Sequence, residues 1–314
     1  MNKAVNKIII PGGAGLVGQN LIVHLRAQGY RHIVVLDKHR ANLEILKNMQ
    51  ADIVCEYADL SRSGDWQRHF VDADTVIMLQ AQIGGNKRNE FLRNNLDATQ
   101  LILEAIRLNN IAYLIHVSSS VVKSVAKDYY TQTKTEQELR VLASNIPCVV
   151  LRPTLMFGWF DRKHFGWLSR FMQKVPIFLI PGEGCYMRQP LYVADFCNII
   201  INCVETRREG GIYNISGHER INYIDIIREI KKITAARTRI VKIPYSMFYA
   251  LLWLWGLFDR NPPFTTQQLQ ALVADDEFEV IDWPAIFNVT ATPFAKAIDE
   301  TFNTPVYSKI TLEF

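Results

Sequence analysis

The feature that most constrains the fold is a regular alternation, over the first half of the chain, between short apolar runs and stretches with helical spacing. The runs are rich in Ile, Val and Leu and lie at residues 7–11, 32–37, 52–60, 75–80, 113–119 and 148–153. Their hydrophobicity is continuous, which is typical of strands buried on both faces of a parallel sheet. Because parallel strands need crossover connections, the pattern predicts a doubly wound α/β domain with right-handed crossovers.

The second half of the chain differs in residue composition and in its predicted secondary structure. After Pro153, proline, glycine and aromatic residues become more frequent and helical patterns dominate to the end. A helical stretch at 194–205 and a strand-like stretch at 212–216 are placed to return to the sheet. Thr292–Pro293 is a start signal for a last helix. We therefore expect two domains, one formed by residues 1–152 with about 192–216, and a smaller, mainly helical one formed by about 153–191 and 217–314.

Composition and charge exclude several classes of function. The 314 residues are 49% hydrophobic and 21% charged, which is ordinary for a soluble globular protein. The net charge of +4 is slight, so we expect no nucleic-acid partner. The histidines and cysteines form no metal-ligand pattern, and His116 is expected in the core. Five free thiols, most of them within apolar runs, suit a reducing, cytoplasmic environment.

The most hydrophobic segment, residues 247–258, carries tryptophan, tyrosine, phenylalanine and leucine and no charged residue. It is too short to cross a bilayer, which requires about 20 apolar residues. We expect a helix that is buried or faces another subunit. The alternative is an interfacial helix whose tryptophans touch a membrane surface, so a peripheral membrane contact stays open.

A glycine-rich turn directly follows the first predicted strand. Gly12, Gly15 and Gly18 form a G-x-x-G-x-x-G pattern that opens a helix. The first glycine permits the tight turn, the second lets a pyrophosphate approach the backbone, and the third lets the helix pack closely. Leu16 and Val17 begin the helix, whose free N–H groups and positive dipole end favour phosphate. In this context the pattern predicts a Rossmann-type dinucleotide site, whereas an isolated glycine pattern would indicate only a turn.

Asp37 ends the second predicted strand and points to the choice of dinucleotide. A carboxylate at this position accepts hydrogen bonds from the adenosine ribose hydroxyls and repels a 2′-phosphate, which favours NAD over NADP. Lys38 and Arg40 follow closely and would suit a phosphate, so the preference is moderate. The alternative role for Asp37 is that of a helix N-cap.

A possible catalytic pair lies in the stretch "DYYTQTKTEQE", residues 128–138. Tyr130 has Lys134 four residues later, and residues at this spacing are neighbours on one face of a helix. Tyr129 instead has Thr133 at that spacing. With this many tyrosines and lysines, chance supplies about one such pair, so the spacing alone does not distinguish a catalytic pair from an ordinary helix face.

Nine features in the same order resemble the extended short-chain dehydrogenase/reductase family, especially its NAD-dependent nucleotide-sugar epimerase/dehydratase branch. The resemblance runs through nearly the whole chain and implies a Rossmann fold, NAD as cofactor and a nucleotide-sugar as substrate. The features are "GGAGLVG" (12–18), Asp37, "ADL" (58–60), "LQAQ" (79–82), "NNLDATQLILEA" (94–105), "VSSS" (117–120), Tyr130–Lys134, "LRPTLMFG" (151–158) and "RQPLYVADF" (188–196).

The resemblance also implies the remaining contacts with the cofactor. Asp59 and Leu60 would flank the adenine, and Asn95 would brace the catalytic region. The other residues implied to contact the cofactor are Leu79, Gln80, Ala81, Pro153, Tyr130 and Lys134.

The expected chemistry follows from the side chains. Oxidising a sugar alcohol requires a base for the hydroxyl proton, and a tyrosine is a poor base at its ordinary pKa of about 10. We expect the Lys134 ammonium, together with the nicotinamide charge, to lower the pKa of Tyr130. Alignment with the family pattern assigns the orienting serine to Ser119, while Ser118 and Ser120 remain open within a one-residue slip.

Departures from the family pattern bear on the reaction and the substrate. Sugar dehydratases of this family carry an Asp–Glu pair where this chain has Ser120 and Val121, which disfavours dehydration. Ser120 is instead expected to contact substrate. Arg188 matches a position that often grips the nucleotide diphosphate, with a solvated surface arginine as the alternative.

Three functions remain after these observations. The first is an NAD-dependent nucleotide-sugar epimerase, and the second is an NAD(P)-dependent sugar reductase or dehydrogenase. The third is a non-catalytic NAD(P)H-binding scaffold, because residues 262–280 resemble a branch related to an accessory subunit of respiratory NADH dehydrogenase. The family pairs two long helices in its dimers, so we expect a homodimer through residues 90–108 and 129–144.

Overall fold

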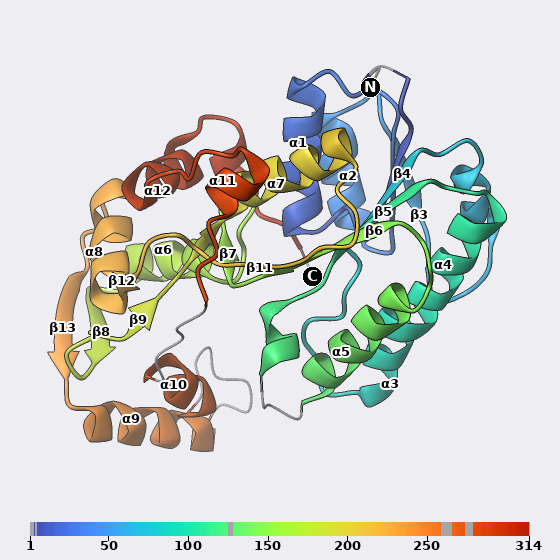
Figure 1. The fold of residues 1–314 in the computed structure, drawn as a ribbon. Coiled ribbons are helices and arrows are strands. Elements are labelled where there is room, and N and C mark those ends of the chain that lie inside the picture. Colours follow the sequence, from blue (N-terminus) through green and yellow to red (C-terminus); the bar gives the residue numbers. More distant parts are fainter. Residues whose placement is uncertain (1–2, 4, 125–127, 259–265, 274–278, 314) are drawn as a thin grey trace.

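The core of the molecule is a seven-stranded, fully parallel sheet (Figure 1). The computed structural model describes all residues except 1–2, 4, 125–127, 259–265, 274–278 and 314. The strand order is β11-β6-β5-β4-β1-β2-β3, so the chain reverses direction across the sheet between β1 and β4. The strands are β1 (Ile8–Pro11), β2 (Ile33–Asp37), β3 (Val54–Tyr57), β4 (Thr75–Met78), β5 (Tyr113–Val117), β6 (Cys148–Pro153) and β11 (Ile212–Ile215).

Burial along the strands explains most of the apolar runs. Every residue of β1, β2, β4 and β5 is buried, as expected for strands covered on both faces. The edge strand β3 is an exception, because Val54 and Tyr57 are exposed there. The expectation that this run is buried on both faces was therefore wrong over the whole of β3, where no residue is buried, since one edge of β3 has no neighbouring strand.

Helices cover both faces of the sheet. On one face lie α1 (Leu16–Ala27), α2 (Arg40–Met49), α7 (Val193–Thr206) and α11 (Trp283–Phe287), which share one apolar core. The helix α1 is followed by Gly29 at φ +95°, a backbone conformation that favours glycine at the end of a helix. On the other face lie a 3-10 turn (Asp65–Phe70), α3 (Arg88–Phe91), a π-helical turn (Leu92–Asp97), α4 (Ala98–Leu108) and α5 (Tyr129–Leu142).

The second half of the chain builds a separate apolar core beside the sheet (Figure 1). Three short strand pairs frame it: β7 (Met156–Phe157) with β10 (Leu191–Tyr192), β8 (Ile177–Pro181) with β13 (Arg239–Ile243), and β9 (Met187–Arg188) with β12 (Ile221–Asn222). Its helices are α6 (Phe165–Lys174), α8 (Tyr223–Ile233) and α12 (Phe294–Asn303). Elsewhere, one 3-10 turn follows β5 at Ser120–Lys123, and another follows α12 at Tyr307–Lys309.

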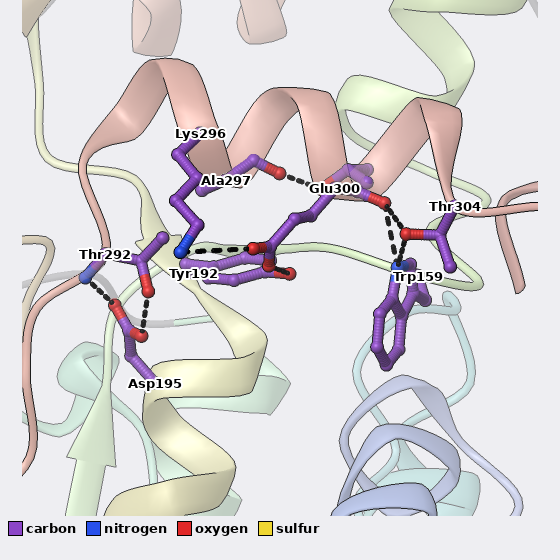
Figure 2. A network of polar contacts seen from close by, with 9 residues as sticks. Trp159, Tyr192, Asp195, Thr292, Lys296, Ala297, Glu300 and Thr304 are labelled. Carbon is purple, nitrogen blue, oxygen red and sulfur yellow. Dashed lines mark hydrogen bonds and ion pairs between the residues drawn. The ribbon is translucent and has the colours of Figure 1, made fainter.

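Polar contacts fix α12 against the rest of the molecule (Figure 2). The Thr292 backbone N–H and hydroxyl both donate to the buried carboxylate of Asp195, at 2.9 and 2.7 Å. The Tyr192 hydroxyl donates to Glu300 at 2.8 Å, and the Trp159 indole donates to the Glu300 carbonyl at 2.9 Å. Since Pro293 is the N-cap residue of α12, the predicted helix start at Thr292–Pro293 is confirmed.

The aromatic segment forms α9 (Tyr245–Phe258), followed in the described chain by α10 (Thr266–Val273). All residues of α9 are described, and none is buried. The expectation of a helix buried within this chain was therefore wrong; among the described elements, α10 and β8 pack beside it and leave every residue at least partly exposed. Of the described residues, no helix is long and apolar enough to cross a membrane. Of the segment 262–280, residues 262–265 and 274–278 lie outside the described part of the chain.

Candidate active site

A cavity of about 1050 Å³ opens at the carboxyl ends of the parallel strands, over the point where the strand order reverses. Ligands of open α/β sheets bind at such a point. The cavity is lined by the glycine turn at one end and by the serine-bearing end of β5 and the start of α5 at the other. Sixteen of the predicted site residues line it: Gly12, Gly15, Leu16, Val17, Gly18, Asp37, Asp59, Leu60, Leu79, Gln80, Ala81, Ser119, Ser120, Tyr130, Lys134 and Pro153.

The three glycines of the turn are constrained in different ways. Gly12 has φ +76°, and a Cβ there would lie 2.4 Å from the Gln80 backbone nitrogen. At Gly18 a Cβ would lie 2.2 Å from the Gly13 carbonyl oxygen. At Gly15, in contrast, the nearest described atom would be 3.6 Å away, which is ordinary contact. The protein itself therefore does not require glycine at position 15, whereas a phosphate group approaching the N-terminus of α1 does.

Asp37 holds the glycine turn through its carboxylate. The backbone N–H groups of Ala14 and His39 each donate to it at 3.0 Å. The N-cap residue of α2 is His39, so Asp37 lies two residues before the cap and does not occupy it. Lys38 lines the cavity, while the Arg40 guanidinium stacks 3.8 Å from the centre of the Tyr57 ring. The Arg40 side chain, one of the two that the sequence suggested for binding a phosphate, therefore contacts Tyr57 instead of lining the cavity.

Serine and tyrosine meet at the other end of the cavity. The Ser119 and Tyr130 side chains both line the cavity, and a hydrogen-bond contribution from Ser119 acts to lower the pKa of the Tyr130 phenol. Ser118 instead donates to Glu138 at 2.5 Å in the interior. Of the three serines left open by the sequence, the structure brings Ser119 to the tyrosine. Tyr129 lies outside the cavity lining and packs against Phe91, with ring centres 5.9 Å apart.

The pKa of Tyr130 is raised in this structure, which differs from the expected lowering. Burial of the phenol penalises the phenolate more than the hydrogen bond with Ser119 favours it. The Lys134 ammonium points elsewhere: its Nζ donates to the Val117 carbonyl at 3.1 Å and to Gln137 Oε1 at 2.5 Å. The lysine contribution that the sequence suggested is therefore absent from this conformation.

Lys134 is almost completely buried, with 1% of its surface exposed. Burial lowers its pKa to about 7, while the carboxylate of Glu138 acts in the opposite direction. Since His116 is fully buried beside it, burial also lowers the pKa of this imidazole well below its ordinary value. His116 thus belongs to the core, as predicted.

A buried polar network continues behind Lys134. Gln137 Nε2 donates to the Thr99 hydroxyl at 2.8 Å, and Thr99 in turn donates to the Asn95 carbonyl at 2.7 Å. The Asn95 side chain accepts from the Gln82 N–H at 2.6 Å and donates to Thr133 at 2.9 Å. Asn95 therefore links the end of β4 to α5 from within the π-helical turn, and it does not line the cavity. Sequence reasoning missed Thr99 and Gln137, whose spacing carries no motif.

A buried ion pair between Arg152 and Glu138 connects helix α5 to strand β6. Arg152 Nε donates to Glu138 Oε2 at 3.0 Å, and the Arg152 Nη2 also bonds this carboxylate. Both side chains are largely buried, so the pair requires good geometry to offset its desolvation. Ser118 adds a third hydrogen bond to the carboxylate. The pair anchors α5, and with it the tyrosine and the lysine, to β6.

The predicted substrate residues are placed differently. Ser120 lines the cavity, whereas Arg188 does not. The Arg188 guanidinium donates to the Met187 carbonyl at 2.7 Å and also to the Leu272 carbonyl of α10. The structure therefore does not bring Arg188 into the cavity, because backbone carbonyls hold its guanidinium elsewhere. The sequence did not single out several polar residues that line the cavity: Lys123, Thr154, His164, Asn214, Ser216 and Glu279.

No metal centre accompanies the site in the described part of the chain. There, no group of three or more His, Cys, Asp or Glu side chains is arranged to hold a metal ion.

Comparison with known proteins gives the family context. Residues 8–216 match the profile of the "NAD dependent epimerase/dehydratase family". UDP-N-acetyl-alpha-D-glucosaminuronate decarboxylase of Bacillus cytotoxicus is 22% identical over 77% of this chain and 85% of its own length. The mitochondrial NADH dehydrogenase [ubiquinone] 1 alpha subcomplex subunit 9 of Dictyostelium discoideum is 24% identical over 82% of this chain and 73% of its own length.

A solved structure has the same fold. UDP-glucuronic acid 4-epimerase of Bacillus cereus, in complex with NAD, superposes with a TM-score of 0.74 at 21% identity and covers 95% of this chain and 96% of its own. The family profile spans the glycine turn, the Ser119–Tyr130–Lys134 set and all seven strands of the sheet. The resemblance to extended short-chain dehydrogenases is thereby confirmed, and the chain belongs to the NAD-dependent epimerase/dehydratase family.

Proposed function

We propose that this protein is an NAD-dependent epimerase that acts on a nucleotide-sugar. The observation that carries the proposal is that Ser119, Tyr130 and Lys134 line the same cavity as the glycine turn. The residues present fit NAD: Gly15 leaves room for a pyrophosphate, and Asp37 is positioned for a ribose diol. The arrangement also matches a solved 4-epimerase in fold, which supports the same class of reaction.

Bound NAD would supply the hydride chemistry, as the acceptor of a hydride from a sugar carbon and the donor of that hydride to the opposite face of the ketone. The side chains of this protein supply the proton transfer. Tyr130 takes the hydroxyl proton of the sugar and later gives it back, and Ser119 orients that hydroxyl through its own hydrogen bonds. A shift of the Lys134 ammonium toward Tyr130 stabilises the phenolate, because a nearby positive charge favours the anion.

The polar residues near the tyrosine favour epimerisation over water elimination. Ser120 and Val121 line the cavity next to Ser119, where a dehydratase needs its own acid and base. Of the carboxylates that line the cavity, Asp37 and Asp59 lie beside the glycine turn, and Glu279 accepts a hydrogen bond from Asn214 of β11. We therefore propose a reaction in which the sugar keeps all its oxygens.

The proposal is tested by mixing purified protein with UDP-sugars and following the configuration at C4 by NMR. We expect interconversion of one C4 epimer pair with no net consumption of added NAD or NADH. The Tyr130→Phe variant should lose at least about 100-fold in kcat, which is typical of removing a general acid–base group, and should still release NAD on denaturation. Because Tyr129 lies outside the cavity lining, Tyr129→Phe is the matched control and should keep full activity.

Two outcomes contradict the epimerase. Absence of turnover of any nucleotide-sugar by protein that carries NAD would refute it. Stoichiometric consumption of NADH with a keto sugar would instead identify a one-way reductase, which is the alternative enzyme. The relative among respiratory NADH dehydrogenase subunits supports a third possibility, a cofactor-binding scaffold. For a scaffold, Tyr130→Phe should leave cellular function intact.

We further propose a cytoplasmic homodimer. All five cysteines are free, as a reducing compartment requires. The exposed side of α4 and α5 carries three apolar side chains, Leu108, Leu139 and Leu142, which are 79%, 56% and 41% exposed. Light scattering on Leu139→Asp tests this, because a dimer that pairs these helices should dissociate. An unchanged molar mass would exclude this interface.

A further inference from the structure

Helix α9 presents an unusual surface, defined here as the α9 surface. Its exposed apolar side chains are Tyr245, Met247, Tyr249, Leu251, Trp253, Leu254, Trp255, Leu257 and Phe258. The exposed fractions run from 36% at Tyr249 to 89% at Phe258. Contiguous apolar surface of this extent marks an interaction site in a folded protein. The helix lies at the margin of the molecule, far from α1 and α2 (Figure 1).

The exposed side chains surround the helix and do not form a stripe. Successive residues rotate by about 100° around a helix axis. Trp253 and Trp255 are therefore about 160° apart, and both are about half exposed. Leu254 lies between these two directions on one side of the helix and Tyr245 on the other, and both are also exposed. A protein groove or a second copy of the helix covers one face, whereas the interfacial zone of a bilayer surrounds a helix on most sides. The geometry thus favours lipid as the occupant.

The segment that leads into the helix is rich in basic residues, of which Lys232 pairs with Glu229. Residues 230–258 contain Lys231, Lys232, Arg237, Arg239 and Lys242 but no Asp or Glu. Lys242 pairs with Glu183 at 2.6 Å, while Arg237 and Arg239 are exposed. Basic residues beside an apolar, tryptophan-bearing helix complement the anionic headgroups of a lipid surface.

The apolar surface continues from α9 onto the neighbouring strand pair. The helix packs against β8, and β8 pairs with β13. Ile177 of β8 and Val241 of β13 are exposed, at 51% and 39%. Arg239 and Val241 share one face of β13, because side chains alternate along a strand. The basic and apolar groups therefore lie on one contiguous end of the molecule.

We propose that the α9 surface docks this protein onto an anionic lipid bilayer. With 14 residues, α9 is about 21 Å long, which is shorter than the hydrocarbon core, so it lies within the headgroup boundary and does not span. Its two tyrosines and two tryptophans occupy the interface, where aromatic rings with a polar atom are favoured. This docking is independent of the reaction carried out in the cavity.

The proposal is tested by vesicle flotation with the full chain. Vesicles of phosphatidylcholine alone, and with a quarter of phosphatidylglycerol, should both recover the protein, and the anionic vesicles should recover more. The double variant Trp253→Gln/Leu257→Gln should lower the partition coefficient by at least about tenfold, since two large apolar groups no longer enter the lipid. No residue of α9 is buried, so this variant should keep the fold.

Two further variants separate the contributions. Leu108→Gln makes the same chemical change at an exposed site of α4 and should leave binding unchanged. Arg237→Gln/Arg239→Gln should abolish the preference for anionic vesicles while binding to phosphatidylcholine persists. Absence of flotation, or flotation that the α9 variant does not alter, would overturn the proposal. A dimer that the α9 variant dissociates, without vesicle binding by the wild type, would assign the surface to a second copy of this chain and would also overturn it.

Discussion

Replacing Lys134 by methionine should change how the stability of the protein depends on pH. Burial lowers the pKa of this lysine to about 7 in the folded protein, from 10.5 for an unperturbed lysine. Below about pH 7 the side chain is charged in both the folded and the unfolded chain, so the cost of burying the charge is constant. Between these two pKa values the unfolded chain holds a proton that the folded chain has released, so the stability of the folded state rises with pH.

The magnitude follows from the same two pKa values. Linkage gives a slope of up to about 1.4 kcal/mol per pH unit, and integration from pH 6 to pH 9 gives about 2.6 kcal/mol. The free energy of unfolding of the wild type should therefore increase by this amount relative to Lys134→Met over that interval. Between pH 5 and 6 the difference should be nearly constant. The hydrogen bonds to Val117 and Gln137 that methionine loses contribute an offset that varies little with pH.

The assay is urea unfolding of both proteins at each pH, followed by circular dichroism. Other groups titrate in the same interval, and taking the difference between the two proteins cancels them where they lie far from residue 134. Glu138 and His116 are the close ones, and the low pKa of the His116 imidazole places its titration below the interval. A difference that does not change between pH 6 and pH 9 would refute the inference that Lys134 is held by burial near neutrality.

Further variants test the cofactor turn and the support of α5. Gly15→Ala should leave the free energy of unfolding within about 1 kcal/mol of the wild type and weaken NAD binding in calorimetry, because its Cβ meets no protein atom within 3.4 Å. Gly18→Ala should instead destabilise by about 1–3 kcal/mol, because its Cβ would meet the Gly13 carbonyl at 2.2 Å. Equal effects would contradict the roles given to the two glycines. Glu138→Gln should cost about 3 kcal/mol in urea unfolding by leaving Arg152 buried without its partner, and a loss below 1 kcal/mol would contradict that ion pair.

The parts of the site that follow from local backbone requirements were predictable from the sequence. The turn requires a positive φ at Gly12 and close packing at Gly18. Glycine meets both requirements, so the pattern could be recognised in the sequence. The strands that are buried on both faces could also be predicted, because such burial requires a continuous apolar run. Helix geometry placed Tyr130 and Lys134 on one face, and the ordered features of the family marked them as the catalytic pair.

The parts that depend on distant residues were not predictable. Lys134 points to Gln137 and Val117, and only the packing of α5 on β5 determines this. Arg188 was assigned to the substrate by its place in a motif, but the carbonyl of Leu272, 84 residues later, holds its guanidinium. The exposure of α9 was missed for a related reason: an apolar segment indicates burial, but its composition does not tell whether protein or lipid covers it.

In the reaction proposed for this protein, one sugar carbon is oxidised and re-reduced with a hydride that never leaves the protein. The most direct measurement is mass spectrometry of the product formed from a UDP-sugar that carries deuterium at C4, incubated in ordinary water with unlabelled NADH in the medium. We expect the epimerised product to keep its deuterium, because the transferred deuteride would be held by bound NAD and returned to the sugar. Loss of the deuterium to water or to the free nucleotide would contradict it.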